Sequence, residues 1–355
     1  MPTTYSYTRL FAFAEAVFRS MGCSETDARQ ATETLLSADL RGVDSHGVAR
    51  LSGYLRLWEA QRVNATPSIG VVHETPSTAV VDGDAGLGLV VGPHAMRLAI
   101  EKAQSVGTGW VAVRNSNHYG IAGYHAMLAL PHDMIGISLT NASPLVAPTH
   151  SLERLLGTNP ISVAIPAGDQ PPFVLDMATT TAAQGKMEIL ERKGLPAPAG
   201  WIQDQYGNSS QNPTETRSGG ALIPLGGETG SHKGYGLGAT VDILSAVLSG
   251  ANYGPWVPPF VAFLQPPANP VGQGIGHFFG AMRVDAFRPA AEFKAHMDNW
   301  IETFRNAKAV PEKHVLIPGD PERLTTEQRL LNGIPLLQKV VDDLQSVGEK
   351  FGLTL

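Results

Sequence analysis

The sequence predicts an α/β protein, and three observations lead to that prediction. Apolar residues recur at helical spacing through most of residues 1–65. Beyond residue 70, short β-branched or apolar runs alternate with helical segments, as in proteins whose helices cover a sheet. The 38 glycines and 26 prolines predict many tight turns and argue against a helical bundle. A chain of 355 residues forms one large domain or two.

The composition excludes several classes of protein. A net charge of −6, spread along the chain, gives no electrostatic footprint for nucleic acid or an anionic membrane, although local sites could still bind small polyanions. No run approaches the roughly 20 apolar residues of a membrane span, and the N-terminus lacks the basic lead of a signal peptide. The single Cys23 rules out an internal disulfide and disfavours a cysteine metal site. We therefore expect a cytoplasmic protein without a metal, nucleic-acid or membrane partner.

The first strong pattern is a helix over Thr26–Leu40. Ser24 and Asp27 form its cap and acidic first turn, and Gly42 ends it. Gly47 closes the turn that begins at Gly42, so the side chains between them are open to a ligand. These side chains include Asp44, Ser45 and His46.

A second helix follows this turn and places Arg50 and Tyr54, four residues apart, on one face. Histidine exchanges a proton near neutral pH, and arginine binds a carboxylate through two parallel hydrogen bonds. His46 and Arg50 together therefore suit a 2-hydroxy or 2-oxo acid. The structural alternative is that Asp44 caps a helix and that His46 and Arg50 are ordinary surface or core residues.

A glycine-rich loop follows the predicted strand Thr78–Asp82 and leads through a helix, Pro93–Ser105, to the strand Gly109–Arg114. The loop glycines are Gly86, Gly88 and Gly92. This order imitates a dinucleotide-binding unit, but Arg114 stands where the ribose-binding acid is expected. We therefore favour a glycine turn without a ligand.

Polar residues follow this second strand at Asn115–Gly120, and strand ends in α/β proteins commonly hold ligands. His118 within them is a second candidate acid/base, and the alternative is an ordinary loop histidine. A helix at Tyr124–Leu130 and a strand at Ile135–Leu139 come next, and that strand ends at Thr140–Ser143.

The middle of the chain predicts a β-hairpin that pairs Ile161–Ile165 with Phe173–Leu175. Asp176–Thr181 follows it and precedes a helix, Ala182–Lys193. Hydroxyl and backbone N–H groups before a helix can bind a phosphate, and Lys186 adds positive charge. The alternative is a helix cap with spare threonines.

The last third of the chain begins with a predicted loop and turn region at Gly194–Gly220. A helix then begins in the glycine-rich run His232–Gly238 and continues over Val241–Leu248. His232 and Lys233 at its start could reach a phosphate or a carboxamide. The later elements are a mobile loop at Pro255–Pro270, a strand at Phe278–Val284, a helix at Ala290–Arg305, a strand at Val315–Ile317, a short helix at Thr326–Leu331 and a last helix from Pro335.

Seven motifs, in order along the chain, make it similar to the type-2 malate/L-lactate dehydrogenase family. They are DSHGVARLSGY at 44–54, NHYG at 117–120, GTNP at 157–160, LDMAT at 175–179, GKMEILERKG at 185–194, HKGYGL at 232–237 and IPGDPE at 317–322. The family includes ureidoglycolate dehydrogenase, sulfolactate dehydrogenase, diketogulonate reductase and piperideine-2-carboxylate reductase. The resemblance implies a homodimer with a non-Rossmann fold that binds NAD or NADP. It also implies a helical part, residues 1–70 with helices of 323–355, and a larger mixed-sheet α/β part, residues 71–322.

The resemblance also implies roles for single residues. By position, His46 is the proton donor or acceptor and His118 a second active-site histidine. The implied substrate-binding residues are Ser45, Arg50, Tyr54 and Ser143. The implied cofactor-binding residues are Thr158, Asn159, Asp176, Met177, Ala178, Lys186, His232, Lys233, Pro318, Gly319 and Asp320.

The chain departs from the family pattern at two places near the expected cofactor. Gln184 stands where many relatives carry an arginine, and an extended turn, Gly226–Ser231, precedes the HKG motif. Both departures leave the preference between NAD and NADP open. The choice of His46 or His118 as principal acid/base is also open.

The residues and the resemblance together predict an NAD(P)-dependent dehydrogenase that interconverts a small 2-hydroxy acid, malate or lactate, with its 2-oxo acid. Arg50 would hold the C1 carboxylate while His46 exchanges the hydroxyl proton and the cofactor takes the hydride. The alternatives are a reductase of a cyclic imino acid, an enzyme for a sulfolactate-type substrate, and a nucleotide-binding protein without turnover. A binding protein would not need a titrating group.

Four aromatic residues bear on the expected dimer: Trp256, Phe260, Phe263 and Phe278. Exposed in a monomer, they would form a sizeable apolar patch, which a second subunit could cover. A C2 dimer is the commonest closed arrangement and could complete the site from the partner chain. The alternative is that these aromatics cap the core of their own subunit.

Overall fold

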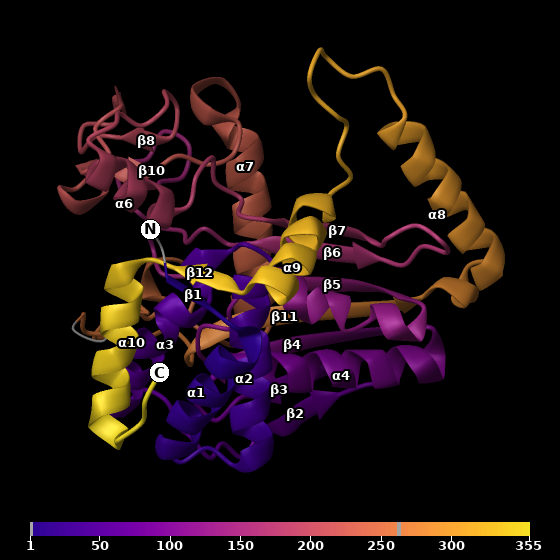
Figure 1. Ribbon diagram of the computed structural model, residues 1–355, viewed down its shortest axis with the longest axis horizontal. Helices are drawn as coiled ribbons and strands as arrows, with labels where there is room; N and C mark the ends of the chain where they lie inside the picture. Colours follow the sequence, from indigo (N-terminus) through magenta and orange to yellow (C-terminus); the bar gives the residue numbers. More distant parts are fainter. Residues whose placement is uncertain (1–2, 261–263) are drawn as a thin grey trace.

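The computed structural model describes residues 3–260 and 264–355. A seven-stranded sheet with the order β2-β3-β4-β11-β5-β6-β7 runs through its middle (Figure 1). β3 and β4 are parallel, and the other neighbouring strands are antiparallel. The strands are β2 (Gly70–Glu74), β3 (Thr78–Asp82), β4 (Thr108–Ser116), β5 (Met134–Thr140), β6 (Ile161–Ile165), β7 (Phe173–Met177) and β11 (Ile275–Arg283). This mixed sheet with its helices confirms the predicted α/β class, and the antiparallel β6–β7 pair confirms the predicted hairpin.

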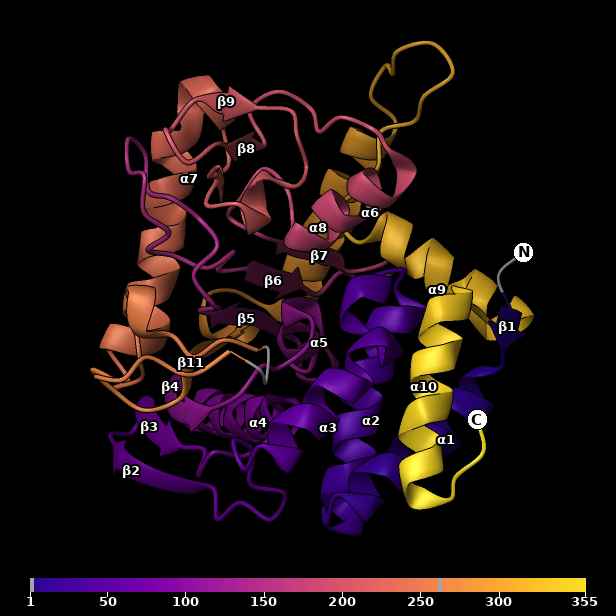
Figure 2. The ribbon, with the colours of Figure 1, turned by 90° about the vertical axis from the view of Figure 1, so that its left-hand side faces the viewer.

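Helices cover both faces of this sheet. Side chains alternate between the two faces along a strand, and the sheet carries apolar side chains on both. In β4, Val111 packs with α4 (Gly88–Val106) on one face. Its neighbour Ala112 packs with α7 (Gly227–Asp242) on the other face. α5 (Ala122–Met127) lies on the same side as α4, and Figure 2 shows α5 and α7 on opposite sides of the strands.

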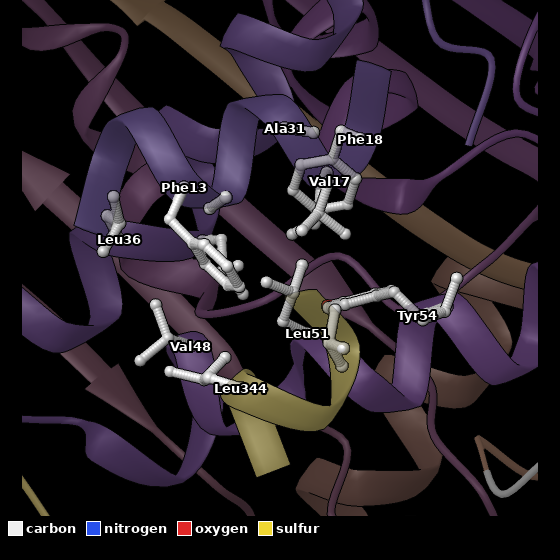
Figure 3. Packing of buried hydrophobic residues seen from close by; sticks show 14 of the residues in the cluster. Phe13, Val17, Phe18, Ala31, Leu36, Val48, Leu51, Tyr54 and Leu344 are labelled. Carbon is white, nitrogen blue, oxygen red and sulfur yellow. The ribbon is translucent and has the colours of Figure 1, made fainter. Parts of the chain in front are cut away.

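A separate apolar cluster is built from α1 (Tyr7–Ser20), α2 (Glu25–Leu40), α3 (Leu51–Glu59) and α10 (Gln338–Phe351). Figure 3 shows Leu344 of α10 beside Val48 and Leu51 within it. The N-terminus of α2 is capped as expected, since the Ser24 hydroxyl accepts the Asp27 N–H at 3.1 Å. Beside the cluster, β1 (Thr3–Tyr5) pairs with β12 (Ile334–Leu336). Both ends of the described chain therefore meet here, while the division at residues 70 and 322 stays a prediction.

A small additional lobe has its own core. β8 (Ile202–Gln203), β9 (Ser209–Ser210) and β10 (Ala221–Leu222) form a three-stranded sheet in the order β10-β8-β9. Its apolar residues pack with Met187 of α6 (Gln184–Lys193). The sequence predicted only loop and turn at Gly194–Gly220, because strands of two residues are too short to show alternation.

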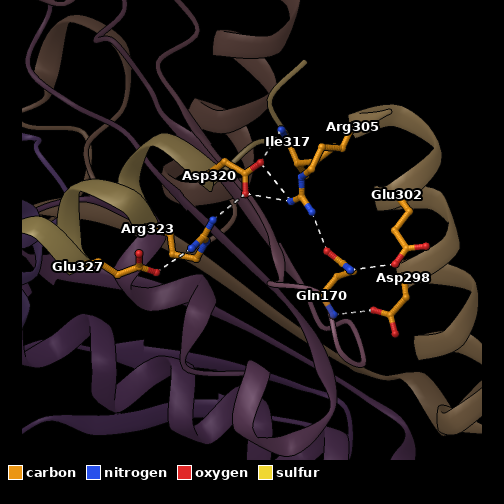
Figure 4. A network of polar contacts seen from close by, with 8 residues as sticks. All are labelled: Gln170, Asp298, Glu302, Arg305, Ile317, Asp320, Arg323 and Glu327. Atoms are coloured by element: carbon orange, nitrogen blue, oxygen red, sulfur yellow. Dashed lines mark hydrogen bonds and ion pairs between the residues drawn. The ribbon is translucent and has the colours of Figure 1, made fainter. Parts of the chain in front are cut away.

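α8 (Ala290–Arg305) follows its predicted bounds and is attached to the β6–β7 turn by polar contacts (Figure 4). The Asp298 carboxylate accepts the backbone N–H groups of residues 168–170 at 2.9 to 3.0 Å. Arg305 donates to the Gln170 side chain at 2.6 Å and to Asp320 at 3.2 Å. Asp320 begins α9 (Asp320–Asn332), so α8 fixes the start of α9.

The prediction that the helix over Pro93–Ser105 begins at Pro93 was wrong. α4 begins at Gly88 and continues through Pro93. A proline inside a helix leaves the carbonyl four residues earlier without its N–H donor. Here that carbonyl, of Leu89, lies 3.0 Å from the Thr34 hydroxyl, whose hydrogen it shares with the Gln30 carbonyl at 2.9 Å. A hydroxyl donor from α2 therefore stands in for the backbone N–H that Pro93 lacks.

Three other predicted boundaries were wrong. Val315–Ile317 is irregular rather than a strand, since the Val174 N–H donates to Pro318 and no ladder forms. Pro335 lies in β12, where it pairs with Thr4, so the last helix begins later, at Gln338. Gly226–Ser231 is not an extended turn, because α7 already begins at Gly227.

The predicted aromatic patch is not a single exposed surface. Phe278 is 9% exposed and stacks on Trp110 at 5.6 Å, inside the core. Trp256 and Phe260 are half-buried. Phe263 lies outside the described residues. No helix within residues 3–260 and 264–355 is long and apolar enough to cross a bilayer.

Candidate active site

The turn between α2 and α3 is built on a buried carboxylate. It consists of two 3₁₀ turns, η1 (Asp44–His46) and η2 (Val48–Arg50). Asp39 is 1% exposed and accepts the Val48 N–H at 2.8 Å. Burial raises the pKa of Asp39 to about 8, although this hydrogen bond acts in the opposite direction. A Cβ on Gly47 would lie 2.1 Å from the Asp39 carboxyl carbon, so the carboxylate occupies the space of a side chain at position 47.

α9 supports the same turn from the outside. Arg329 donates to the Asp44 carboxylate, with one contact of 3.3 Å, and to the backbone carbonyl of Asp39. Its side chain is 13% exposed, so this ion pair is shielded on the arginine side. A Cβ on Gly42 would lie 3.1 Å from the Thr325 methyl, and Gly42 has a φ of +78°. The turn is therefore held between α2 and α9.

His46 and Arg50 take up complementary positions on this turn. The Ser45 hydroxyl lies 2.9 Å from His46 Nδ1. Arg50 donates through Nε to the Ser45 carbonyl at 2.6 Å, and its two terminal nitrogens have no protein partner among residues 3–260 and 264–355. Burial, and then the charge of Arg50, lower the pKa of His46 to about 4. The half-buried imidazole is thus neutral at physiological pH, and the guanidinium fork is available to a carboxylate.

His118 lies beside His46, although 72 positions separate them in the sequence. The two rings stack with centroids 5.7 Å apart at 23°. The hydroxyl of Tyr54, which is fully buried, lies 2.6 Å from His118 Nδ1, and the Gly120 N–H points at the same atom from 3.4 Å. Burial holds the pKa of His118 well below its usual value, and His46 and Arg50 add to this effect. The structure therefore brings together His46, His118, Ser45, Arg50 and Tyr54.

Phe260 completes this group and was not identified as a site residue from the sequence. Its ring lies 4.5 Å from that of His118 and 5.1 Å from that of Tyr54. The Ser143 hydroxyl accepts the Phe260 N–H at 3.2 Å, so Ser143 holds this loop, while its predicted contact with substrate stays a prediction. The only sequence signal was an aromatic residue in a proline-rich loop, which does not reveal its distant partner.

Behind His118, three buried rings stack in a row. Tyr119 lies between His125 and His277, with centroids 4.3 and 4.7 Å away. His277 contacts the hydroxyls of Thr140 at 2.7 Å and Ser116 at 2.8 Å, and so ties together the ends of three strands. Burial lowers the pKa of His125 to about 4 and that of His277 to about 3. These neutral rings form a rigid support that the sequence analysis missed.

The residues predicted to bind the cofactor fall into several groups. Asp176, at the end of β7, accepts the Gly123 N–H at 2.8 Å. The residue is exposed to solvent, yet protein atoms packed around its carboxylate desolvate it and raise its pKa to about 6. Met177 and Ala178, which follow it, are half-buried. A Cβ on Gly185 would lie 3.5 Å from Ser45, so α6 begins beside the turn at Asp44–Arg50.

A second group of predicted cofactor residues is Thr158, Asn159 and Lys186. Asn159 is fully buried, and its amide bonds to the Ala142 N–H and the Gly238 carbonyl. The Thr158 carbonyl accepts the Thr179 N–H at 2.9 Å. Lys186 is exposed and lies 5.6 Å from the Trp201 ring, at an apolar recess of about 450 Å³.

The remaining two groups lie on α7 and at the start of α9. His232 and Lys233 are exposed on the second turn of α7. The loop Pro318–Asp320 is fixed to β7 and α8, since Pro318 accepts the Val174 N–H and the 6% exposed Asp320 bonds to Arg305. The roles of all these residues toward a cofactor stay predictions.

Two observations fit a nicotinamide cofactor near α6 and β7. Gln184 Oε1 is buried and has no hydrogen-bond partner in the described part of the chain, while its Nε2 donates to Thr216 at 3.0 Å. The Asp176 carboxylate is accessible and has acceptor capacity left. Unused acceptors suit the hydroxyl and amide donors of such a cofactor. Within residues 3–260 and 264–355, no group of three or more His, Cys, Asp or Glu side chains could hold a metal ion.

Comparison with known proteins gives one consistent result. A family model described as Malate/L-lactate dehydrogenase matches residues 5–345. The chain is 45% identical over 349 residues to a malate dehydrogenase of Pyrococcus horikoshii, which covers 97% of this chain and 94% of that protein. It is 38% identical over 340 residues to an L-sulfolactate dehydrogenase of Methanocaldococcus jannaschii, covering 96% and 94%. The crystal structure of malate dehydrogenase from Entamoeba histolytica matches with a TM-score of 0.93 and 33% identity, covering 100% and 99%.

Proposed function

Because this chain belongs to the malate/L-lactate dehydrogenase family, we propose that it oxidises malate reversibly to the 2-oxo acid. It is an oxidoreductase that acts on CH–OH groups and uses a nicotinamide cofactor. The observation that most supports a 2-hydroxy acid as substrate is the constellation around His46, and malate in particular is suggested by the malate dehydrogenase relative. The Arg50 guanidinium, whose two terminal nitrogens have no partner among the described residues, lies beside two neutral imidazoles.

The roles follow from this geometry. Arg50 is anchored through Nε, so its two terminal nitrogens can hold the C1 carboxylate in a bidentate pair. This fixes the C2 hydroxyl near the imidazoles, and His46 takes its proton at Nε2 during oxidation. A bound cofactor supplies the hydride acceptor. Asp176, Gln184 and the Pro318–Asp320 loop would hold it.

The pKa of His46 fits this role once substrate is present. In the free protein the Arg50 charge contributes to lowering it. A bound carboxylate neutralises that charge and so raises the pKa of His46 back toward neutrality. The base then gains proton affinity at the moment when it is needed.

A second substrate, sulfolactate, is favoured by the L-sulfolactate dehydrogenase relative. Sulfolactate carries a sulfonate where malate carries its second carboxylate, so both substrates offer Arg50 the same C1 carboxylate. Purified protein assayed with NAD and with NADP against malate, lactate, sulfolactate and piperideine-2-carboxylate separates these functions. We expect the largest kcat/KM with malate. A flat nicotinamide absorbance with all four compounds would refute the proposal.

The assembly that we propose is a homodimer in the cytoplasm. The helical segment that continues α7 exposes three aliphatic side chains, Ile243, Val247 and Leu248, each more than half exposed. Neighbouring exposed aliphatics of this kind are typical of subunit interfaces. Light scattering at micromolar concentration measures the mass of the assembly, and a stable, active monomer would contradict the dimer.

A further inference from the structure

We propose that His46 and His118 have different roles in proton transfer, and that the hydroxyl group bound to Nδ1 of each ring determines its role. This hydroxyl belongs to Ser45 for His46 and to Tyr54 for His118. In this scheme Tyr54 fixes His118 as a permanent hydrogen-bond donor through Nε2, whereas Ser45 leaves His46 free to accept and return the proton. The inference rests on the proposed function and assigns Tyr54 as a positioning residue.

The first step concerns the Tyr54 hydroxyl, which contacts His118 Nδ1 at 2.6 Å. Tyr54 is fully buried between Phe18 and Phe260, with ring centroids 6.4 and 5.1 Å away. Burial raises the pKa of this phenol, so it keeps its proton and has one hydrogen to donate. His118 Nδ1 is its one acceptor among the described residues.

The second step is that a backbone N–H converges on the same nitrogen. The Gly120 N–H points at His118 Nδ1 from 3.4 Å, and a backbone N–H can only donate. Two donors facing one ring nitrogen require that nitrogen to carry the lone pair. In a neutral imidazole the hydrogen must then sit on Nε2. His118 can therefore donate to a substrate oxygen through Nε2 but has no free lone pair to accept a proton.

The third step concerns His46, whose Nδ1 partner is of a different kind. The Ser45 hydroxyl at 2.9 Å can rotate, and so it can donate to Nδ1 or accept from it. Its oxygen has no other side-chain hydrogen bond among residues 3–260 and 264–355. His46 Nε2 can therefore hold either a lone pair or a hydrogen, as a reversible acid/base requires.

The resulting chemistry balances in both directions. In oxidation, the substrate O–H bond breaks and its proton passes to His46 Nε2. The C2–H bond breaks as the C2–O double bond forms, and a bound nicotinamide cofactor would take up this hydrogen with its electron pair. His118 Nε2–H donates to that oxygen throughout and changes no covalent bond. Reduction reverses each of these steps.

The tautomer of His118 can be measured without any turnover. In the full-length protein labelled with ¹⁵N-histidine, the Nδ1 and Nε2 chemical shifts report which nitrogen carries hydrogen, and His118→Gln identifies the resonances. We expect Nδ1 to be unprotonated and Nε2 protonated in the wild type, with Tyr54→Phe shifting this balance toward Nδ1–H. Tyr119→Phe is the matched control, because it removes a buried hydroxyl next to His118 whose partner is Ser138. It should leave the His118 shifts unchanged.

Kinetics test the division of roles. Glutamine at position 118 retains an N–H near the place of Nε2, so His118→Gln should reduce kcat by about 10-fold. His46→Gln cannot transfer a proton and should reduce kcat by about 10² to 10⁴-fold. Tyr54→Phe should fall between them, and Tyr119→Phe should stay within about threefold of wild type.

Either experiment, the ¹⁵N measurement or the kinetics, can overturn the inference. A wild-type His118 with hydrogen on Nδ1 refutes the role of Tyr54, and this measurement stands even if Tyr54→Phe does not fold. Equal losses in His118→Gln and His46→Gln refute the division of roles. If no substrate reacts, the proposed function fails, while the ¹⁵N shifts still decide the tautomer.

Discussion

Replacing Gly47 by alanine should destabilise the protein through Asp39. The added Cβ would lie 2.1 to 2.2 Å from all three atoms of the Asp39 carboxyl group, whereas ordinary contacts begin near 3.4 Å. Small shifts of Asp39 cannot relieve an overlap of more than 1 Å, because this side chain is buried on α2. The φ of Gly47 is −89°, so glycine is not required here by a left-handed backbone. The cost arises from the contact with Asp39.

The magnitude follows from two contributions. Overpacking of a buried position costs about 1 to 3 kcal/mol. Displacing Asp39 also breaks its 2.8 Å bond to the Val48 N–H, worth about 0.5 to 1.5 kcal/mol because the raised pKa of Asp39 keeps this acceptor mostly uncharged at neutral pH. We expect Gly47→Ala to lower the free energy of unfolding by about 1.5 to 4.5 kcal/mol. Gly230→Ala is the control, because nothing lies within 4 Å of a Cβ there and the site is inside α7.

A double-mutant cycle identifies the cause. Asp39→Ala alone leaves the Val48 N–H without its acceptor and should cost about 1 to 3 kcal/mol. It also removes the atoms that the new methyl group would overlap, so the double variant should be more stable than the sum of the single changes by about 1 to 3 kcal/mol. Urea unfolding midpoints of the four proteins measure this difference. Additive effects would show that Gly47 is required for another reason.

Three further predictions follow from the site. His46→Asn should lower kcat by about 10² to 10⁴-fold while NADH binding, measured by fluorescence titration, is retained; unchanged kcat would make His118 the acid/base. Arg50→Lys should mainly raise KM for malate, because the charge remains but the bidentate grip is lost; a loss confined to kcat would contradict this role. The folded pKa of His277, about 3, is below the unfolded value of 6.5, so the unfolded state binds the proton and stability falls as pH drops below 6.5. Unfolding at pH 7 and pH 5 should show His277→Gln losing about 2 kcal/mol less than wild type over this range, and equal losses would mean that His277 titrates normally.

Local patterns in the sequence predicted much of this fold. The bounds of α8 and the pairing of β6 with β7 are set by apolar spacing within short windows, which a sequence displays directly. The turn that carries Ser45 and His46 was also predicted from a short window, because Gly42 and Gly47 lie on either side of it. Residues that act through partners distant in the chain left no such signal. Phe260 meets Tyr54 and His118, and the Thr34 hydroxyl compensates for Pro93, through contacts that only the folded chain creates.

α9 and α10 support the turn at Asp44–Arg50 although they are made last, and this order matters for biosynthesis. Arg329 and Asp44 are 285 positions apart, and Leu344 covers Val48 and Leu51 from even farther along the chain. At about 5 to 20 residues per second, a ribosome needs roughly 15 to 60 s to make the chain between Asp44 and Arg329. During that time Val48 and Leu51 of the 44–54 motif are not yet covered by Leu344, and chaperones can bind such exposed apolar side chains. Translation that stops before α9 yields a polypeptide with both histidines of the site but without the contacts of Arg329 and Leu344 that support the turn at Asp44–Arg50.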